Sequence, residues 1–232
     1  MERLLILNTA TVNGAVGVAA DGEVIAEERI ELSHASNSIL PTIDGVLKRS
    51  LTTIASVDRI VVVKGPGTFT GSRVGVSIGK GLSYALGKPL TGVTTFQAVA
   101  FTGFLEVPAD STPVWAMLDA RRHQYCAQRF SAADGGLIPA GEPWREGSHV
   151  FDVLYESGGH VVCAYSRDAV SPEKMELISS TGATVWSFGV FPSCRGILAA
   201  ASKLGADEDP FTLEPLYLRT TDELFDVPKA AT

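Results

Sequence analysis

Hydrophobic runs and turn signals near the start of the chain predict three consecutive strands. Residues 4–7 form an unbroken apolar run that is typical of a buried strand. Residues 15–20 and 23–32 predict two more strands on either side of Asp21-Gly22, a dipeptide that favours a tight hairpin turn. The alternation of the third strand slips near Glu28. We therefore expect an antiparallel meander.

The pattern then changes to alternating helices and strands. One apolar face predicts a helix over residues 38–48, in which Pro41 fits only within the first turn. The β-branched run 59–63 predicts an interior parallel strand. A helix over 71–86, a strand over 90–93 and a helix over 95–104 follow. The order βββαβαβα indicates an α/β fold of the ribonuclease-H-like or actin-like kind, and we assign it to residues 1–105.

The rest of the chain is shorter and less regular. Residues 106–113 contain two prolines and predict a linker, and strands at 114–118 and 124–130 open a reduced second lobe over 113–192. A helix near 194–204 belongs to a unit, 193–220, that we expect to pack back on the N-terminal lobe. Residues 226–232 are expected to form a mobile tail.

The segment Lys64–Gly71 lies directly between a strand and a helix, where α/β proteins place phosphate-binding loops. It misses both common patterns, because no lysine follows the second glycine and the third glycine arrives one residue late for a dinucleotide loop. Weak candidates for cofactor contacts are Thr9, Gly65, Gly67 and Gly71. The alternative is a tight turn that carries no ligand, with Thr70 as the helix N-cap.

Small residues recur every fourth position in the predicted helix over 71–86, at Gly71, Gly75, Gly79 and Ser83. An interior glycine costs a helix roughly 1 kcal/mol against alanine, so the row indicates that something approaches the backbone closely. Two interpretations remain open. A helix of another protein docks on the row, or the row packs on the chain's own sheet or on helix 38–48. The sheet-facing side is expected to be Val74, Ile78, Leu82 and Ala85.

Composition narrows the function classes. The chain has 232 residues, 45% of them hydrophobic, which is enough for a sizeable core, and its net charge of −7 argues against an independent grip on nucleic acid. Three cysteines without a CxxC pair argue against a disulfide framework or a structural zinc site. The first apolar run is too short for a signal peptide or a membrane span, so we expect a cytoplasmic protein that does not contact a membrane.

Motifs for catalysis are weak. The four histidines form no paired metal-binding motif, which argues against metal catalysis and predicts no metal site. Gly75-Val76-Ser77-Ile78-Gly79 matches the letters of a hydrolase elbow, yet Ser77 lies about two turns inside the predicted helix. Asp119 and Arg121 form either a site at a strand end or an ion pair that holds a turn. For His34 a capping or surface role is favoured. We therefore assign no catalytic residue.

The segment Lys64–Leu82 resembles the G-P-G-S-F-T-G-x-R-[IV]-G-x-x-x-x-K-G-L signature of the TsaB (YeaZ) family. Residues 6–11, 33–41, 118–122 and 215–219 extend the resemblance over nearly the whole chain. It implies an actin-like (ASKHA) fold of two lobes, the second reduced. It also implies an accessory, non-enzymatic subunit, needed for threonylcarbamoyl transfer to N6 of adenosine 37 in tRNA.

The resemblance implies partners as well. These are a second copy of the chain, the catalytic paralogue TsaD and the ATPase TsaE, with tRNA met only through the complex. No cofactor is implied for the chain itself, and any ATP would lie at the interface of the complex. In the family the matching helices 38–48 and 71–86 carry partner contacts. The candidate interface residues are Ile39, Leu40, Ile43, Val46, Ser72, Arg73, Gly75, Val76, Gly79, Lys80 and Ser83.

One position departs from the family pattern. Asn8 stands where the family commonly has the aspartate with which actin-like ATPases hold hydrated magnesium. A neutral amide cannot supply the charge that a hard cation prefers. The alternative function, an independent actin-like nucleotide-binding ATPase, is weakened accordingly, whereas the scaffold function is not.

Overall fold

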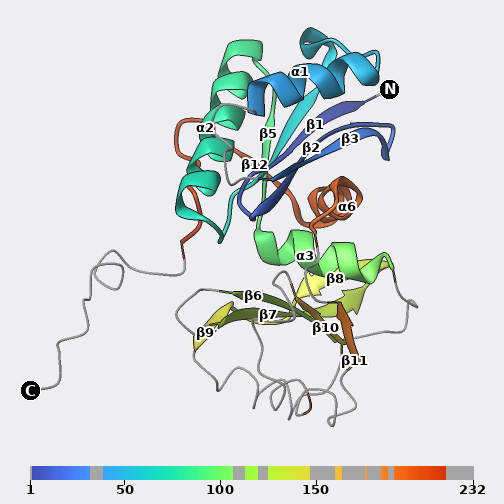
Figure 1. Ribbon diagram of the computed structural model, residues 1–232, viewed down its shortest axis with the longest axis vertical. Helices are drawn as coiled ribbons and strands as arrows, with labels where there is room; N and C mark the ends of the chain where they lie inside the picture. The colour runs from blue at the N-terminus through green and yellow to red at the C-terminus, as the bar shows by residue number, and fades with distance from the viewer. Residues whose placement is uncertain are drawn as a thin grey trace, which may run out of the picture.

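The computed structural model describes residues 2–31, 39–106, 113–119, 125–146, 160–163, 176, 184–187 and 191–217. These residues form two lobes, each built on one sheet, and helix α3 lies between the sheets (Figure 1). Residues 107–112 of the predicted linker at 106–113 lie outside the described residues, as does the tail at 226–232.

The N-terminal sheet has the strand order β12-β5-β4-β1-β2-β3. The predicted meander is confirmed, because β2 pairs antiparallel with both β1 and β3, and β1, β4 and β5 then run parallel. Its strands are β1 (Arg3–Asn8), β2 (Asn13–Ala20), β3 (Glu23–Glu31), β4 (Arg59–Val63), β5 (Leu90–Val93) and β12 (Ala206–Glu208). The actin-like order of the first lobe is thus present.

The hairpin between β2 and β3 carries one correction. Asp21 and Gly22 have φ of 50° and 84°, as a type I′ turn requires. The slip expected near Glu28 instead lies at Ile25, since Val18 pairs with Ala26 and Ala19 pairs with Val24. Ile25 is the extra residue of a β-bulge, whereas Glu28 pairs in register with Val16.

Two helices cover each face of this sheet. Leu5 and Leu7 of β1 point to a core shared with α1 and α2, whereas Leu4 and Ile6 point to a core shared with α3 and α6. The alternation of side chains along a strand thus separates the two layers. The helices are α1 (Ile39–Arg49), α2 (Phe69–Leu86), α3 (Thr95–Phe104) and α6 (Cys194–Leu204), and a short 3₁₀ turn, η2 (Ile54–Ser56), precedes β4.

The second lobe is a smaller mixed sheet with the order β11-β10-β6-β7-β8, to which β9 adds by pairing with β7. Val114, Ala116 and Phe130 extend the core of α3 and α6 into this lobe. The two lobes therefore share one hydrophobic layer. The strands are β6 (Val114–Asp119), β7 (Tyr125–Ala133), β8 (Gly136–Pro139), β9 (Trp144–Glu146), β10 (His160–Cys163) and β11 (Thr184–Ser187).

The chain returns to the N-terminal lobe after the second sheet. β12 pairs antiparallel with the edge strand β5, and residues 209–217 then run beside α2 (Figure 1). We call residues 206–217 the C-terminal strap. Leu213 is its buried apolar anchor, and the Leu216 amide donates to the Lys64 carbonyl oxygen at 2.7 Å.

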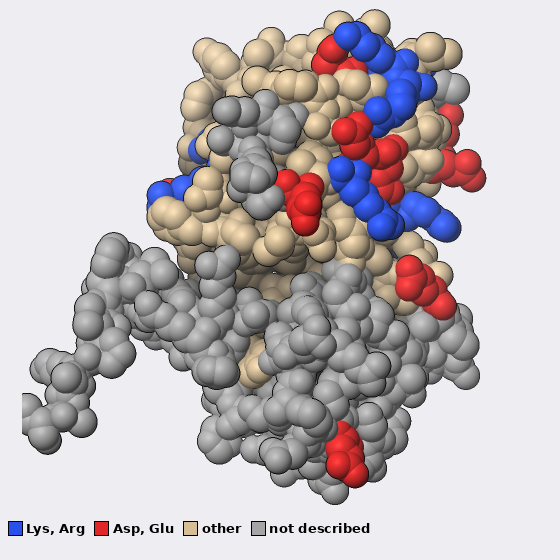
Figure 2. All heavy atoms as spheres, viewed as in Figure 1, with Lys and Arg blue, Asp and Glu red and all other residues tan. Residues whose placement is uncertain are grey.

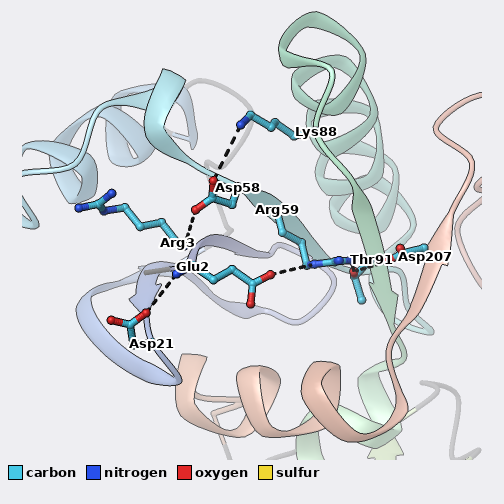
Figure 3. Close-up of polar contacts among 8 residues, drawn as sticks. All are labelled: Glu2, Arg3, Asp21, Asp58, Arg59, Lys88, Thr91 and Asp207. Carbon is cyan, nitrogen blue, oxygen red and sulfur yellow. Dashed lines mark hydrogen bonds and ion pairs between the residues drawn. The ribbon is translucent and has the colours of Figure 1, made fainter.

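Polar contacts fasten the strap at the end of the sheet where β4 and β5 begin (Figure 3). The Arg59 guanidinium pairs with Glu2 and Asp207 and donates to Thr91 Oγ1 at 2.9 Å. Nearby, Asp58 accepts from the Arg3 amide at 2.8 Å and forms an ion pair with Lys88. Arg59 of β4 thus joins Thr91 of β5 and Asp207 of the strap to Glu2, which lies just before β1.

Candidate functional site

The glycine turn is closed by the start of helix α2. The Thr68 hydroxyl accepts from the Gly71 amide at 3.2 Å, and the Thr68 amide donates to the Ala10 carbonyl oxygen at 2.7 Å. The N-cap is therefore Thr68 and not Thr70 as expected, because the helix begins two residues earlier than predicted, at Phe69.

Asn8 and Thr9 build the neighbouring turn after β1. The Asn8 side chain is fully buried, accepts from the Ala10 amide at 3.2 Å and donates to Thr11 Oγ1 at 3.1 Å. The Thr9 hydroxyl donates to the Gly71 carbonyl oxygen at 2.6 Å. Asn8 thus stabilises its own turn, with its amide nitrogen used as a donor that an aspartate could not provide.

The four weak cofactor candidates lie together, but they pack on the chain itself. A methyl group at Gly67 would overlap the Ala10 carbonyl oxygen, and one at Gly71 would overlap the Thr9 carbonyl oxygen. At Gly65 (φ 106°) a methyl would lie 2.7 Å from the Leu216 carbonyl oxygen. The amides of Ala10, Thr68 and Gly71 are engaged within the chain, and Asn8 supplies no charge. These residues fit a packed turn better than a nucleotide phosphate with magnesium.

The glycine row of α2 faces the chain's own sheet. A methyl at Gly75 would overlap the Thr9 hydroxyl, and one at Gly79 would overlap a Val62 methyl. Ser83 is buried and donates to the Lys88 carbonyl oxygen at 2.6 Å. Of the two interpretations left open by the sequence, packing on the sheet is the one observed. Thr9, in the turn after β1, lies against Gly71 and Gly75, and Val62 of β4 lies against Gly79. Contact of Gly71, Gly75, Gly79 and Ser83 with another protein stays a prediction.

The side of α2 expected to face the sheet is also different. Val74, Ile78 and Leu82 are only half-buried and pack at the margin of the core shared with α1, and Ala85 is exposed. Glycine has no side chain to hold the helix away, so the glycine row takes the position closest to the sheet. The larger aliphatic side chains are displaced to the flank.

The other interface candidates divide by exposure. Most are buried in this chain, and this group comprises Ile39, Ile43, Val46, Ser72 and Val76. Leu40 is 62% exposed on α1. Arg73 and Lys80 reach the surface, but both bind the strap. The Arg73 guanidinium lies 3.6 Å from the centre of the Phe69 ring and its Nε donates to Tyr217 at 2.8 Å, and Lys80 Nζ donates to the Leu213 carbonyl oxygen at 3.0 Å.

A different row of α2 faces solvent, and sequence reasoning missed it. We define the outward face of α2 as Thr70, Ser77, Gly81, Tyr84 and Ala85, all of which are exposed. Positions seven apart lie two helical turns apart, so the spacing of Thr70, Ser77 and Tyr84 was the available signal. A side chain at Gly81 would meet no atom within 4 Å, and Tyr84 packs edge-on against the exposed Phe211 of the strap.

This surface differs from the charged flank of the lobe. In Figure 2 many acidic and basic side chains gather toward the side of α1 and β3. The five residues of the outward face of α2 are all uncharged residue types. The outward face therefore combines small side chains, exposed aromatic rings and little charge. That composition suits contact with another protein surface.

The remaining motifs add no catalytic centre among the described residues. Ser77 is exposed in the middle of α2 rather than at a strand-to-helix turn, so the elbow geometry is not present there. In the described parts of the chain, no three His, Cys, Asp or Glu residues gather as metal ligands, and no helix is long and apolar enough to cross a membrane. His34, Arg121 and the side chain of Asp119 lie outside the described residues.

Comparison with known proteins decides the family. Residues 28–176 match the family model of TsaD, tRNA N6-adenosine threonylcarbamoyltransferase, which is well over half of the chain. The chain belongs to the TsaD family. Among relatives in this family, the Escherichia coli tRNA threonylcarbamoyladenosine biosynthesis protein TsaB is 30% identical over 58% of this chain and 58% of its own length.

Other comparisons place the chain beside TsaB proteins. TsaB of Haemophilus influenzae is 32% identical over 52% of this chain and 50% of that protein. The chain therefore spans about half the length of these curated relatives. An uncharacterized protein of Mycobacterium tuberculosis is 32% identical over 96% of this chain and 94% of its own. YeaZ from Pseudomonas aeruginosa, at 20% identity, covers 94% of this chain and all of that one with a TM-score of 0.75, which confirms the fold. The resemblance to TsaB (YeaZ) is confirmed.

Proposed function

We propose that the chain is a non-catalytic subunit of the machinery that transfers threonylcarbamoyl to N6 of adenosine 37 in tRNA. It acts by binding the catalytic paralogue TsaD and by pairing with a second copy of itself, with TsaE joining the assembly and tRNA bound only through the complex. The relatives named TsaB support this role in tRNA modification. Cytoplasmic location follows from the same role.

The observation that carries the proposal is the uncovered outward face of α2. The glycine row packs on the sheet, and this leaves Ser77 and Gly81 on the opposite side of the helix, at the surface beside the exposed ring of Tyr84. Small side chains let a partner helix approach closely, and an aromatic ring at the edge provides a contact with a large buried area. Leu40 of α1 adds an exposed aliphatic side chain to the same layer of the lobe.

The test is a pair of matched arginine substitutions. Gly81→Arg places a long side chain where nothing lies within 4 Å, so the fold should tolerate it, but a partner helix should not. Ser202→Arg, at an exposed position of α6 on the other layer, is the control. We expect Gly81→Arg to abolish co-purification with TsaD and self-association in light scattering at an unchanged melting temperature. Retained complexes in Gly81→Arg would overturn the proposal.

The alternative is an independent nucleotide-binding ATPase that uses the 65–71 turn. Its direct test is calorimetric titration of the purified chain with ATP and magnesium. Because Ala10, Thr68 and Gly71 use their amides within the chain, we expect no saturable heat below millimolar nucleotide. Tight binding accompanied by turnover would replace the scaffold proposal. Nucleotide that binds only when TsaD is added would place ATP at the joint interface.

A further inference from the structure

The point where the strap ends is held by a cluster on α2. Tyr217 lies 5.9 Å from the Phe69 ring, centre to centre, and its hydroxyl accepts from Arg73 Nε, while the Arg73 guanidinium covers Phe69. The amide of the preceding residue, Leu216, is bonded to Lys64. The chain beyond Tyr217 therefore starts from a fixed point at the N-terminal end of α2.

The sequence just beyond that point has a distinct pattern. Residues 222–227 read Asp-Glu-Leu-Phe-Asp-Val, so that Leu224 and Phe225 are flanked by three acidic side chains. These residues lie outside the described part of the structure. An apolar pair flanked by acids is suited to a surface with apolar contacts and basic side chains.

Helix α2 offers exposed rings at the right distance, and it carries two positive side chains beside the uncharged outward face. Its charged side chains are Arg73 and Lys80, both positive, and neither forms an ion pair among the described residues. Tyr84 lies fifteen residues beyond Phe69, which is about 22 Å along a helix. The seven residues from 218 to 224 span at most roughly 25 Å when extended. Leu224 and Phe225 can therefore reach Tyr84 and Phe211, the two most exposed rings beside α2.

We propose that residues 222–227 dock on the outward face of α2 in the same chain, and so cover the partner-binding surface until a partner displaces them. The inference rests on the proposed function, because it takes this face as the one that partners bind. A short tether gives an effective concentration near the millimolar range, so even weak docking covers the face for much of the time. Such docking lowers the apparent affinity for a partner, because only the fraction of chains in which the face is open can bind.

The first experiment measures docking without any partner. A fluorescein-labelled peptide of residues 218–229 is titrated against the full-length Leu224→Ala/Phe225→Ala variant, and anisotropy is recorded. We expect saturable binding that weakens as salt rises, because the motif carries three negative charges. The unsubstituted chain should bind the peptide several-fold more weakly, since its own segment competes. Ser77→Glu in the double-variant background should remove binding, and Ser202→Glu should not. No binding to any variant would overturn the inference.

The second experiment measures the effect on a partner. Titration calorimetry compares TsaD binding to the unsubstituted chain, to Leu224→Ala/Phe225→Ala, and to Thr220→Ala/Thr221→Ala as a control in the same segment. We expect the first variant to bind about two- to tenfold more tightly and the control to match the unsubstituted chain. Equal affinities throughout would overturn the inference and leave the proposed function intact. Peptide docking without TsaD binding by any variant would instead reject the proposed function alone.

Discussion

Thr9 contacts Gly71 through both its side chain and its backbone. The Thr9 hydroxyl donates to the Gly71 carbonyl oxygen at 2.6 Å, and the Thr9 carbonyl oxygen occupies the space where a side chain at residue 71 would stand. A hydrogen bond and a steric requirement for glycine therefore coincide at the point where β1 meets α2. The signature that resembles a phosphate loop thus fixes helix α2 to the sheet.

The two kinds of glycine in α2 should respond oppositely to alanine. A methyl at Gly79 would overlap Val62 in the core, so we expect Gly79→Ala to lower the free energy of unfolding by about 1–3 kcal/mol through overpacking. Gly81 has open space, so Gly81→Ala should raise that free energy by roughly 0.5–1 kcal/mol through helix propensity. Urea denaturation of both variants checks the pair. Similar effects for both would contradict the packing of the glycine row against the sheet.

Much of the fold could be predicted from the sequence, because its signals are local. The Asp21-Gly22 turn, the run from Arg59 to Val63 and the helical spacing after Ile39 each identify an element without reference to the rest of the chain. The boundary of α2 was missed by two residues because Thr68 and Thr70 are equally good caps by residue type. Only the contact of the Thr68 amide with Ala10 distinguishes them.

The candidate site was harder to predict. A row of glycines indicates that another element packs closely on the helix, but it does not identify that element. The sequence showed that Gly75 and Gly79 lie in one row, and the same row would serve a partner helix or the chain's own sheet. The usual rule that larger apolar residues face the core assigned Val74 and Ile78 to the sheet. In α2 that rule is reversed, because Thr9 and Val62 fill the space beside the glycines.

The strap should depend on one buried side chain far more than on its exposed ring. Leu213 is 4% exposed within the core of α1 and α2, so Leu213→Ala should lower the free energy of unfolding by about 2–4 kcal/mol. Phe211 is 72% exposed, so Phe211→Ala should lower the free energy of unfolding by less than about 0.5 kcal/mol. Chemical denaturation measures both values. Equal losses in the two variants would contradict Leu213 as the buried anchor of the strap.

The ion pairs should also contribute to stability according to their burial. Arg59 is about one-quarter exposed and joins Glu2, Asp207 and Thr91, so Arg59→Met should cost about 1 kcal/mol of stability. Lys48 forms an exposed pair with Asp44 within α1, and Lys48→Met should cost less than about 0.5 kcal/mol and less again in high salt. Thermal unfolding at two salt concentrations checks the order. Equal losses would contradict a structural role of the Arg59 network in holding the strap.

Cys194 should behave as an inert thiol in the folded protein. It is buried, and burial raises the pKa of its thiol well above the usual value, with the nearby Glu27 carboxylate raising it further. Because the thiolate is the reactive form, iodoacetamide at pH 8 should leave Cys194 unmodified until the protein unfolds, as mass spectrometry of the corresponding peptide would show.

The raised pKa of Cys194 also predicts how stability changes with pH. The folded state holds the thiol proton more tightly than the unfolded state, so the contribution of Cys194 is fully present below the unfolded pKa. It is lost as pH rises through that value toward the folded one. The decrease in melting temperature from pH 7 to pH 10 should therefore be larger in the unsubstituted chain than in Cys194→Ala. Equal differences would show that the Cys194 thiol ionises as easily in the folded protein as in the unfolded one.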